Sequence, residues 1–167
     1  MIFPVRCPLC DGIIREDEKY TGYCDPCRKK IHFVGNDYCM KCGKPVGNAD
    51  VEYCSDCKKL THYYTENRAA YVYEGDIKKA MYRFKYMNRR DYGRAFAGDI
   101  RRELDGYFER MLSLRKIDAV MPVPMFPDKL RHRGYNQAEW LAEEIGRMLG
   151  IPVLKNRLIR VKNTEKM

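Results

Sequence analysis

The eight cysteines are the residues of this sequence whose type and spacing indicate chemistry most directly. They form four Cys-x-x-Cys pairs within the first 57 residues, and no cysteine follows. Two thiolates separated by two residues can bind one ion, so each pair supplies half of a tetrahedral four-thiolate site. The sequence therefore predicts two metal sites, with the ligands Cys7, Cys10, Cys24, Cys27, Cys39, Cys42, Cys54 and Cys57.

An internal repeat bears on how these pairs are partnered. The stretches that begin at Cys7 and at Cys39 share a layout, in which a first pair and a polar turn precede Tyr-Cys-x-x-Cys and basic residues. One unit used twice favours sequential partnering, with the first two pairs on one ion and the last two on the other. Interleaved partnering also fits the spacing.

The identity of the metal follows from the compartment and from the ligand set. The N-terminus lacks the apolar run of a secretory signal, and no window resembles a membrane span, so we expect a cytoplasmic protein with reduced thiols. Four thiolates could hold iron, but paired ribbons of this kind usually hold zinc. The prediction is two Zn²⁺ ions.

Four thiolates close the coordination shell of zinc, whereas a catalytic zinc keeps a position open. We therefore expect both ions to be structural, since so short a polar segment builds little core without them. His32 and His62, just beyond the second and fourth pairs, are interpreted as packing or solvated residues.

The cysteines must be positioned by a small module, and the rest of the chain has a different composition. We predict a double zinc ribbon of knuckles and β-hairpins over residues 1–60, a polar linker over 61–67 and an α/β domain over 68–167. Within that domain, periodicity and turn signals predict strands at 69–73, 117–123 and 151–154, and helices at 76–87, 92–114 and 137–149. The apolar 117–123 run is typical of a buried parallel strand.

The formal net charge of +9 falls to about +5 once eight thiolates and two zinc ions are counted. Nine Lys or Arg residues lie between Lys78 and Arg102, and a further group lies between Lys129 and Arg133. This excess is compatible with phosphate-rich partners. For the first group alone, a solvated helix face is the simpler interpretation.

A basic, glycine-containing loop follows the predicted strand at 117–123 and precedes a helix. In open α/β sheets, ligands dock at this position, and helix N-terminal amides suit phosphate groups. Arg131 and Arg133 could make forked contacts to phosphate oxygens, with Asn136 and Gln137 as neutral donors. A solvated basic loop with a capping Asn explains the same residues equally well.

These motifs resemble the ComF family of competence-associated, phosphoribosyltransferase-like proteins. The resemblance rests on the cysteine-rich N-terminus and on two later stretches, AAYVYEGDIKKAMYRFKYMNRRDYG and PVPMFPDKLRHRGYNQAEWLA. It implies a type I phosphoribosyltransferase fold, a partial parallel sheet with flanking helices. It also implies that the RGYNQ loop binds the pyrophosphate of phosphoribosyl pyrophosphate, with Mg²⁺. The residues implicated by this likeness are Arg133, Gly134, Asn136, Gln137, Arg131, Lys129 and Lys85.

The sequence departs from the family where the sugar would bind. Such proteins carry two adjacent acidic residues and a Thr-Gly loop that grip the ribose phosphate, and this sequence reaches Met167 without them. Stabilising a developing sugar cation needs such acidic groups. We therefore expect a truncated, non-catalytic chain with an exposed edge near 117–123, completed by a missing C-terminal half or by a partner.

Two functions are consistent with the sequence. In the first, the chain binds phosphoribosyl pyrophosphate or related phosphates through the RGYNQ loop. In the second, it is a non-enzymatic module for DNA uptake that contacts single-stranded DNA or a helicase-type partner. Tyrosines near basic residues could stack bases in that case: Tyr63, Tyr64, Tyr82 and Tyr86.

Overall fold

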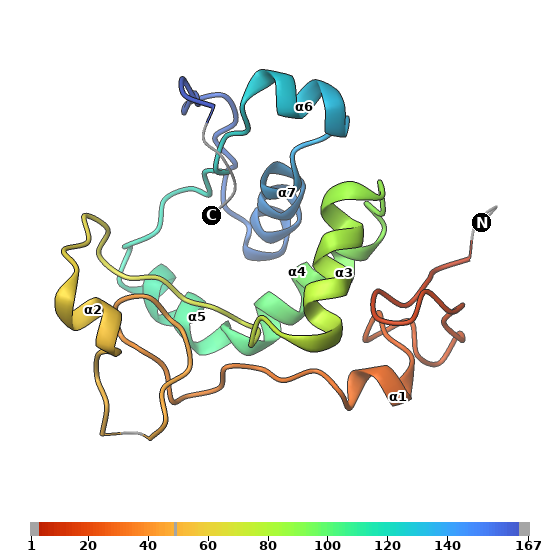
Figure 1. The fold of residues 1–167 in the computed structure, drawn as a ribbon, viewed down its shortest axis with the longest axis horizontal. Coiled ribbons are helices and arrows are strands. Elements are labelled where there is room, and N and C mark those ends of the chain that lie inside the picture. Colours follow the sequence, from red (N-terminus) through yellow and green to blue (C-terminus); the bar gives the residue numbers. More distant parts are fainter. Residues whose placement is uncertain (1–3, 49, 164–167) are drawn as a thin grey trace.

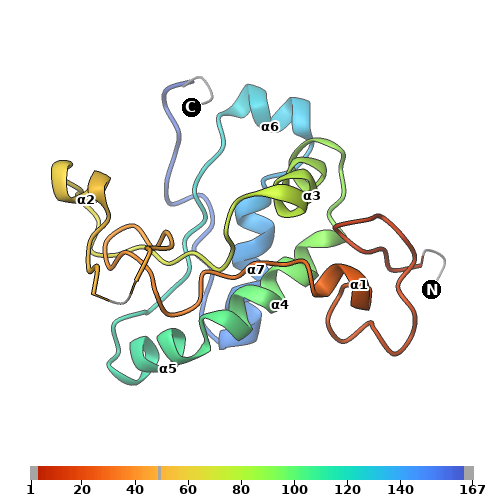
Figure 2. The ribbon, with the colours of Figure 1, turned by 60° about the horizontal axis from the view of Figure 1, so that its bottom comes forward.

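The computed structural model describes residues 4–48 and 50–163. Met167, which the truncation hypothesis concerns, lies outside the described residues. The helices are α1 (Asp25–Arg28), α2 (Ser55–Lys59), α3 (Gly75–Tyr86), α4 (Tyr92–Glu103), α5 (Asp105–Ser113), α6 (Pro127–Arg133) and α7 (Gln137–Leu149). Figures 1 and 2 place α1 and α2 at opposite ends of the molecule, joined by an extended segment. None of these helices combines the length and apolar character needed to cross a bilayer.

The two units of the cysteine repeat also share a backbone conformation. In each unit a tight turn follows the first cysteine: the amide of Asp11 donates to the carbonyl of Cys7, and that of Gly43 donates to Cys39, both at 2.8 Å. Asp11 and Gly43 both have positive φ, which this turn requires. Antiparallel bridges close the two hairpins at Arg6–Ile13 and Tyr38–Pro45. The second pair of each unit lies at the start of α1 or α2.

One hydrophobic core joins the first ribbon unit to α3 and α4. Leu9, Ile14, Tyr23 and Ile31 belong to the same buried cluster as Ile77, Ala80, Phe84, Tyr92 and Phe96. Cys7 and Cys27 are also members, whereas Cys39 and Cys54 are not. The first unit is therefore built into the helical part of the molecule.

The predicted parallel sheet is not formed in the part of the chain that the structure describes. Residues 117–123 and 151–154 meet in a single parallel bridge, Val120–Val153, with hydrogen bonds only around Val120. Pro122, Pro124 and Pro152 have no N–H to extend a ladder. Residues 69–73 likewise make one bridge, Tyr71 with Phe33. The expectation of an α/β sheet was therefore wrong here, and extended segments replace the strands.

Two further expectations about helices need correction. The helix predicted over 92–114 is divided at Leu104, whose φ of −113° and ψ of 18° end α4 and allow α5 to turn away. The basic loop after residue 123 contains the seven-residue helix α6, which begins at Pro127, a favoured first helical residue. By contrast, α7 has the bounds that the sequence predicts, with Asn136 before it and Gly150 after it.

Candidate metal centres and phosphate cavity

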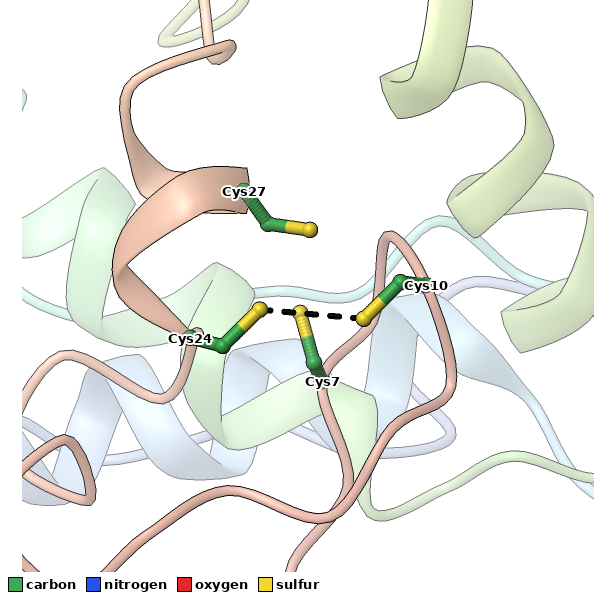
Figure 3. A group of neighbouring side chains, drawn as sticks. All are labelled: Cys7, Cys10, Cys24 and Cys27. Carbon is green, nitrogen blue, oxygen red and sulfur yellow. Dashed lines mark hydrogen bonds between the residues drawn. The ribbon is translucent and has the colours of Figure 1, made fainter.

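The first four cysteines lie together at the junction of a knuckle and α1. Figure 3 shows Cys7 and Cys10 from the knuckle facing Cys24 and Cys27, with the sulfurs pointing toward one another. The Sγ atoms of Cys10 and Cys24 are 3.7 Å apart. None of the four is disulfide-bonded.

The last four cysteines form an equivalent cluster. The Sγ atoms of Cys42 and Cys54 are 3.8 Å apart, and within each cluster all ligand atoms lie within 4.8 Å of one another. The structure therefore groups the thiols sequentially, not in the interleaved arrangement. The backbone amide of Cys54 also donates to Cys39 Sγ at 3.3 Å.

This geometry can be tested against a zinc ion. Tetrahedral coordination with Zn–S bonds of about 2.3 Å places sulfurs roughly 3.8 Å apart, because the edge of a tetrahedron is about 1.63 times its centre-to-corner distance. The Cys10–Cys24 and Cys42–Cys54 sulfur pairs match this value. The two four-cysteine sites fit two structural zinc ions, each with a complete thiolate shell.

The pKa values of the second cluster show why its thiols need a cation. Burial raises the pKa of Cys39, but backbone N–H groups of Cys42, Cys54 and Lys41 outweigh it and lower that pKa to about 6. Burial and the neighbouring thiols Cys42 and Cys54 raise the pKa of Cys57 to about 12. The thiol of Cys39 therefore loses its proton readily, whereas that of Cys57 is opposed by its neighbours, and a bound divalent ion would supply the compensating charge.

The two histidines beyond the pairs have different surroundings. His32 is exposed, and its Nδ1 lies 3.2 Å from Glu74 Oε1. His62 is half-buried, and its Nε2 lies 3.3 Å from Cys57 Sγ. The interpretation as a solvated residue describes His32, whereas His62 contacts a predicted metal ligand.

Separately from the metal centres, a cavity of about 1090 Å³ lies among α3, α6 and α7. These three helices are neighbours in Figures 1 and 2. Its lining includes every residue that the sequence analysis assigned to phosphate binding, namely Lys85, Lys129, Arg131, Arg133, Gly134, Asn136 and Gln137. Lys85 comes from the end of α3, far from the others in sequence, and the fold brings it to them.

Asn136 and Gln137 build the turn between α6 and α7. Asn136 Oδ1 accepts from the amide of Ala138 at 3.1 Å, and its Nδ2 donates to the carbonyl of Val123 at 3.2 Å. Gln137 is buried, donates to the carbonyl of Lys85 at 3.4 Å and accepts from Arg133 at 2.7 Å. These contacts use the polar atoms that the sequence analysis offered to phosphate, so both side chains position the loop.

The cations differ in how firmly they are held. Arg133 bonds to Gln137, and its guanidinium lies 4.6 Å from the ring centroid of Tyr86. Arg131 is largely exposed and pairs with Asp128. Lys85 Nζ lies 6.0 Å from the ring centroid of Tyr73. Arg133 thus has two contacts that fix its orientation.

Sequence reasoning missed two cations of this cavity, Arg90 and Arg160. Arg90 donates to the carbonyl of Gly134 at 3.1 Å, and its guanidinium lies 4.6 Å from the ring centroid of Tyr135. Tyr135 is buried and its hydroxyl donates to the carbonyl of Phe84. In the sequence, the pair of arginines at 89–90 between two predicted helices was the feature that could have indicated a role for Arg90.

A second cavity, of about 860 Å³, lies between the first ribbon unit, α4 and α7. Among the described residues that line it, the cations are Arg6, Lys19, Arg89, Arg90, Arg94 and Arg102, and Asp91 is the one carboxylate. The aromatic residues Tyr20 and Trp140 also line it, and Tyr20 is exposed. The sequence analysis did not predict this cavity, because its walls come from three distant segments.

Comparison with known proteins bears on the N-terminal third. Residues 1–58 match the family model described as Double zinc ribbon domain. The chain is 41% identical over 56 residues to "Competence protein F" of Haemophilus influenzae, and this match covers 34% of the chain and 24% of that protein. The chain thus spans about a quarter of the length of this relative. No solved structure matches the chain. Residues 1–58 therefore match a double zinc ribbon domain, and the N-terminal third of the chain is similar to that competence protein.

Proposed function

We propose that this chain is a cytoplasmic, competence-associated protein that binds phosphoribosyl pyrophosphate or a related diphosphate in the cavity among α3, α6 and α7. The observation that carries this proposal is the gathering of cations from three distant segments, since Lys85, the α6 arginines and Arg160 line one space. Each arginine can donate two parallel hydrogen bonds to phosphate oxygens, and a diphosphate offers several such oxygens.

The same cavity favours binding without turnover. Among the described residues that line it, none is Asp or Glu. A phosphoribosyl transfer needs a group that stabilises the positive charge developing on the sugar, and a carboxylate is the usual one. Mg²⁺, which prefers oxygen ligands, would therefore enter with the diphosphate and not as a resident ion.

Isothermal titration calorimetry tests this function directly. Phosphoribosyl pyrophosphate with Mg²⁺ should bind the zinc-loaded chain, and Arg133→Ala should weaken binding at least about tenfold, because a charge-assisted hydrogen bond contributes about 1.5–3 kcal/mol. The matched control is Arg147→Ala on the exposed side of α7, where Arg147 pairs with Glu144. Absence of heat, or equal affinities for both variants, would contradict the proposal. Pyrophosphate alone, titrated in parallel, shows whether the ribose contributes.

A second function is favoured by the cavity beside the first ribbon unit. We propose that this cavity holds single-stranded DNA, because its cations line the same space as the exposed Tyr20 and the indole of Trp140. Basic grooves with aromatic side chains on which bases stack are the usual binding sites for single-stranded nucleic acid. Arg94 is exposed there, and its side chain makes no ion pair or hydrogen bond within the described part of the chain.

Fluorescence anisotropy with a labelled oligonucleotide tests the second function. Affinity should fall as salt rises, since neutralised phosphates release counterions, and Arg94→Ala should lower both the affinity and the salt slope. Arg147→Ala again serves as the control. No binding at low salt, or an Arg94→Ala variant that behaves like the parent, would exclude this site.

A further inference from the structure

The cysteine repeat places a histidine at the same position in both units. His32 follows Cys27 by five residues, and His62 follows Cys57 by five residues. Only the second histidine contacts a cysteine of its metal site, with its Nε2 3.3 Å from Cys57 Sγ, while His32 faces Glu74. The first unit therefore provides an internal comparison for the role of His62.

The segment that carries His62 is tied to the second metal site. Lys41, which lies between Cys39 and Cys42, donates from its Nζ to the carbonyls of Tyr64 and Thr65. The amide of Asn67 donates to the carbonyl of Lys41 at 2.8 Å. The His62 ring also packs on Tyr64, with 5.0 Å between ring centroids. The imidazole is thus held beside the thiolates by the knuckle itself.

We propose that His62 is a reserve ligand of the second four-cysteine site, able to replace the thiolate of Cys57. In the exchange, the bond between the metal and Cys57 Sγ breaks, a bond to His62 Nε2 forms, and the released thiolate takes a proton from water. Three thiolates and one imidazole are a common structural zinc set, so the exchanged site stays closed. The formal charge of a zinc centre changes from −2 to −1.

This role follows from ligand chemistry as well as proximity. Imidazole nitrogen is a normal zinc ligand, with zinc–nitrogen bonds of about 2.0–2.1 Å, and His62 already contacts the sulfur that it would replace. Cys57 is itself half-buried, at the middle of the five-residue helix α2, and is therefore partly exposed to solvent. The inference rests on the metal sites and is independent of the ligands proposed for the two cavities.

Cobalt binding by the full chain tests the proposal. The Cys57→Ala chain should bind two Co²⁺ ions, with the d–d absorption of the second site shifted to shorter wavelength as nitrogen replaces sulfur. The double variant Cys57→Ala/His62→Ala should bind the second ion at least about tenfold more weakly than Cys57→Ala. Losing an outer-shell partner alone costs about 10–100-fold in metal affinity, so losing a ligand should cost at least the lower value. At the first site, the variants Cys27→Ala and Cys27→Ala/His32→Ala should bind Co²⁺ with the same weakened affinity. Equal spectra and affinities for the two Cys57 variants would overturn the proposal.

A second measurement avoids variants that fail to fold. The folded, zinc-loaded chain and its His62→Ala variant are alkylated with iodoacetamide, and native mass spectrometry counts the zinc ions on molecules labelled at Cys57. Parent molecules labelled there should keep two zinc ions, and His62→Ala molecules should keep one. Loss of the second ion from both proteins alike would also overturn the proposal.

Discussion

At the scale of single residues, Asp99 carries a buried carboxylate whose negative charge must be compensated by neighbouring groups. It is fully buried in α4, and its carboxylate accepts from Arg28 at 2.6 Å, from Arg102 and from the Tyr71 hydroxyl at 2.8 Å. Burial raises the pKa of Tyr71 well above its usual value, so that hydroxyl remains a donor. Because Arg28 follows Cys27 directly, Asp99 connects the first metal site to α4.

Asp99→Asn should lower the free energy of unfolding by about 3 kcal/mol. Removing one partner of a buried ion pair leaves the other uncompensated, and this value is the lower end of the usual range because both arginines are partly exposed. Urea unfolding of the zinc-loaded chain measures it. The control Asp128→Asn removes an exposed pair with Arg131 and should cost less than about 1 kcal/mol. Similar losses for both variants would contradict this account.

Glu18 provides a pH-dependent contribution at the same scale. Its carboxylate accepts from the backbone amides of Asp25 at 2.9 Å and Arg15 at 3.0 Å. These hydrogen bonds, that of Asp25 first, lower the pKa of Glu18 below its ordinary value of 4.5. The folded state therefore favours the ionised form, and the associated stability is complete above pH 4.5 and disappears as pH falls through the lowered pKa.

The comparison of the parent chain with Glu18→Gln measures this contribution. At neutral pH the parent should be more stable, and the difference in free energy of unfolding should shrink as pH falls below the ordinary pKa of Glu18. Acid also releases zinc, but it does so from both proteins, so the difference between them is the relevant quantity. A difference that stays constant through this range would show that Glu18 acts through its shape and not its charge.

At the scale of elements, the packing of α4 against α7 depends on Gly93. A Cβ at Gly93 would lie 2.4 Å from the Trp140 ring, so the absence of a side chain lets the indole of α7 contact the backbone of α4. A Cβ at Gly98, in the same helix, would lie 3.5 Å from the end of the flexible Arg102 side chain, an ordinary van der Waals contact. The two glycines therefore have opposite consequences when replaced.

Gly93→Ala should destabilise the chain by about 1–3 kcal/mol through overpacking, although alanine favours helix. Gly98→Ala should stabilise it by about 0.5–1 kcal/mol, because alanine loses less conformational freedom in a helix interior. Thermal unfolding followed by circular dichroism distinguishes them. If both variants were stabilised, Trp140 would have to move away from α4 without cost.

Elements with local end signals were the ones that the sequence predicted well. Asn136 accepts from Ala138 and Gly150 adopts positive φ, so both ends of α7 are determined by neighbouring residues. The break at Leu104 is less visible, because an apolar residue in a continuous apolar stripe gives no stop signal. The segment between 123 and the helix at 137–149 was predicted to be a loop, yet Pro127 starts a helix within it.

The sheet could not be predicted from local signals, because strand pairing depends on distant partners. Residues 117–123 have the composition of a buried strand, but a ladder needs successive donors on both neighbours. Here Pro152 and Pro122 interrupt the pairing on either side of the Val120–Val153 bridge. The cysteine clusters were predictable from residue type and spacing. The place of Arg90 in the cavity and the Cys57–His62 contact depend on tertiary structure, which local sequence signals do not show.

At the scale of the whole molecule, the two metal sites differ in what depends on them. Cys7 and Cys27 belong to the core cluster that includes Phe84, Tyr92 and Phe96 of α3 and α4. The Arg28–Asp99 bond adds a polar connection between the first site and α4. The second site lies at the other end of the molecule, where α2 is located in Figures 1 and 2. Its cysteines are absent from that cluster.

Loss of the first metal should therefore unfold the helices, and loss of the second should not. Cys7→Ala, which leaves three thiolates, should abolish hydrogen-exchange protection in α3 and α4, because metal binding and folding of the first unit are one equilibrium. Cys39→Ala, at the equivalent repeat position, should leave that protection intact and expose only residues around the second unit. Equal loss of protection in both variants would mean that the second site also supports the core, through Arg68, whose guanidinium lies 3.5 Å from the Tyr38 ring centroid and 5.5 Å from that of Tyr107.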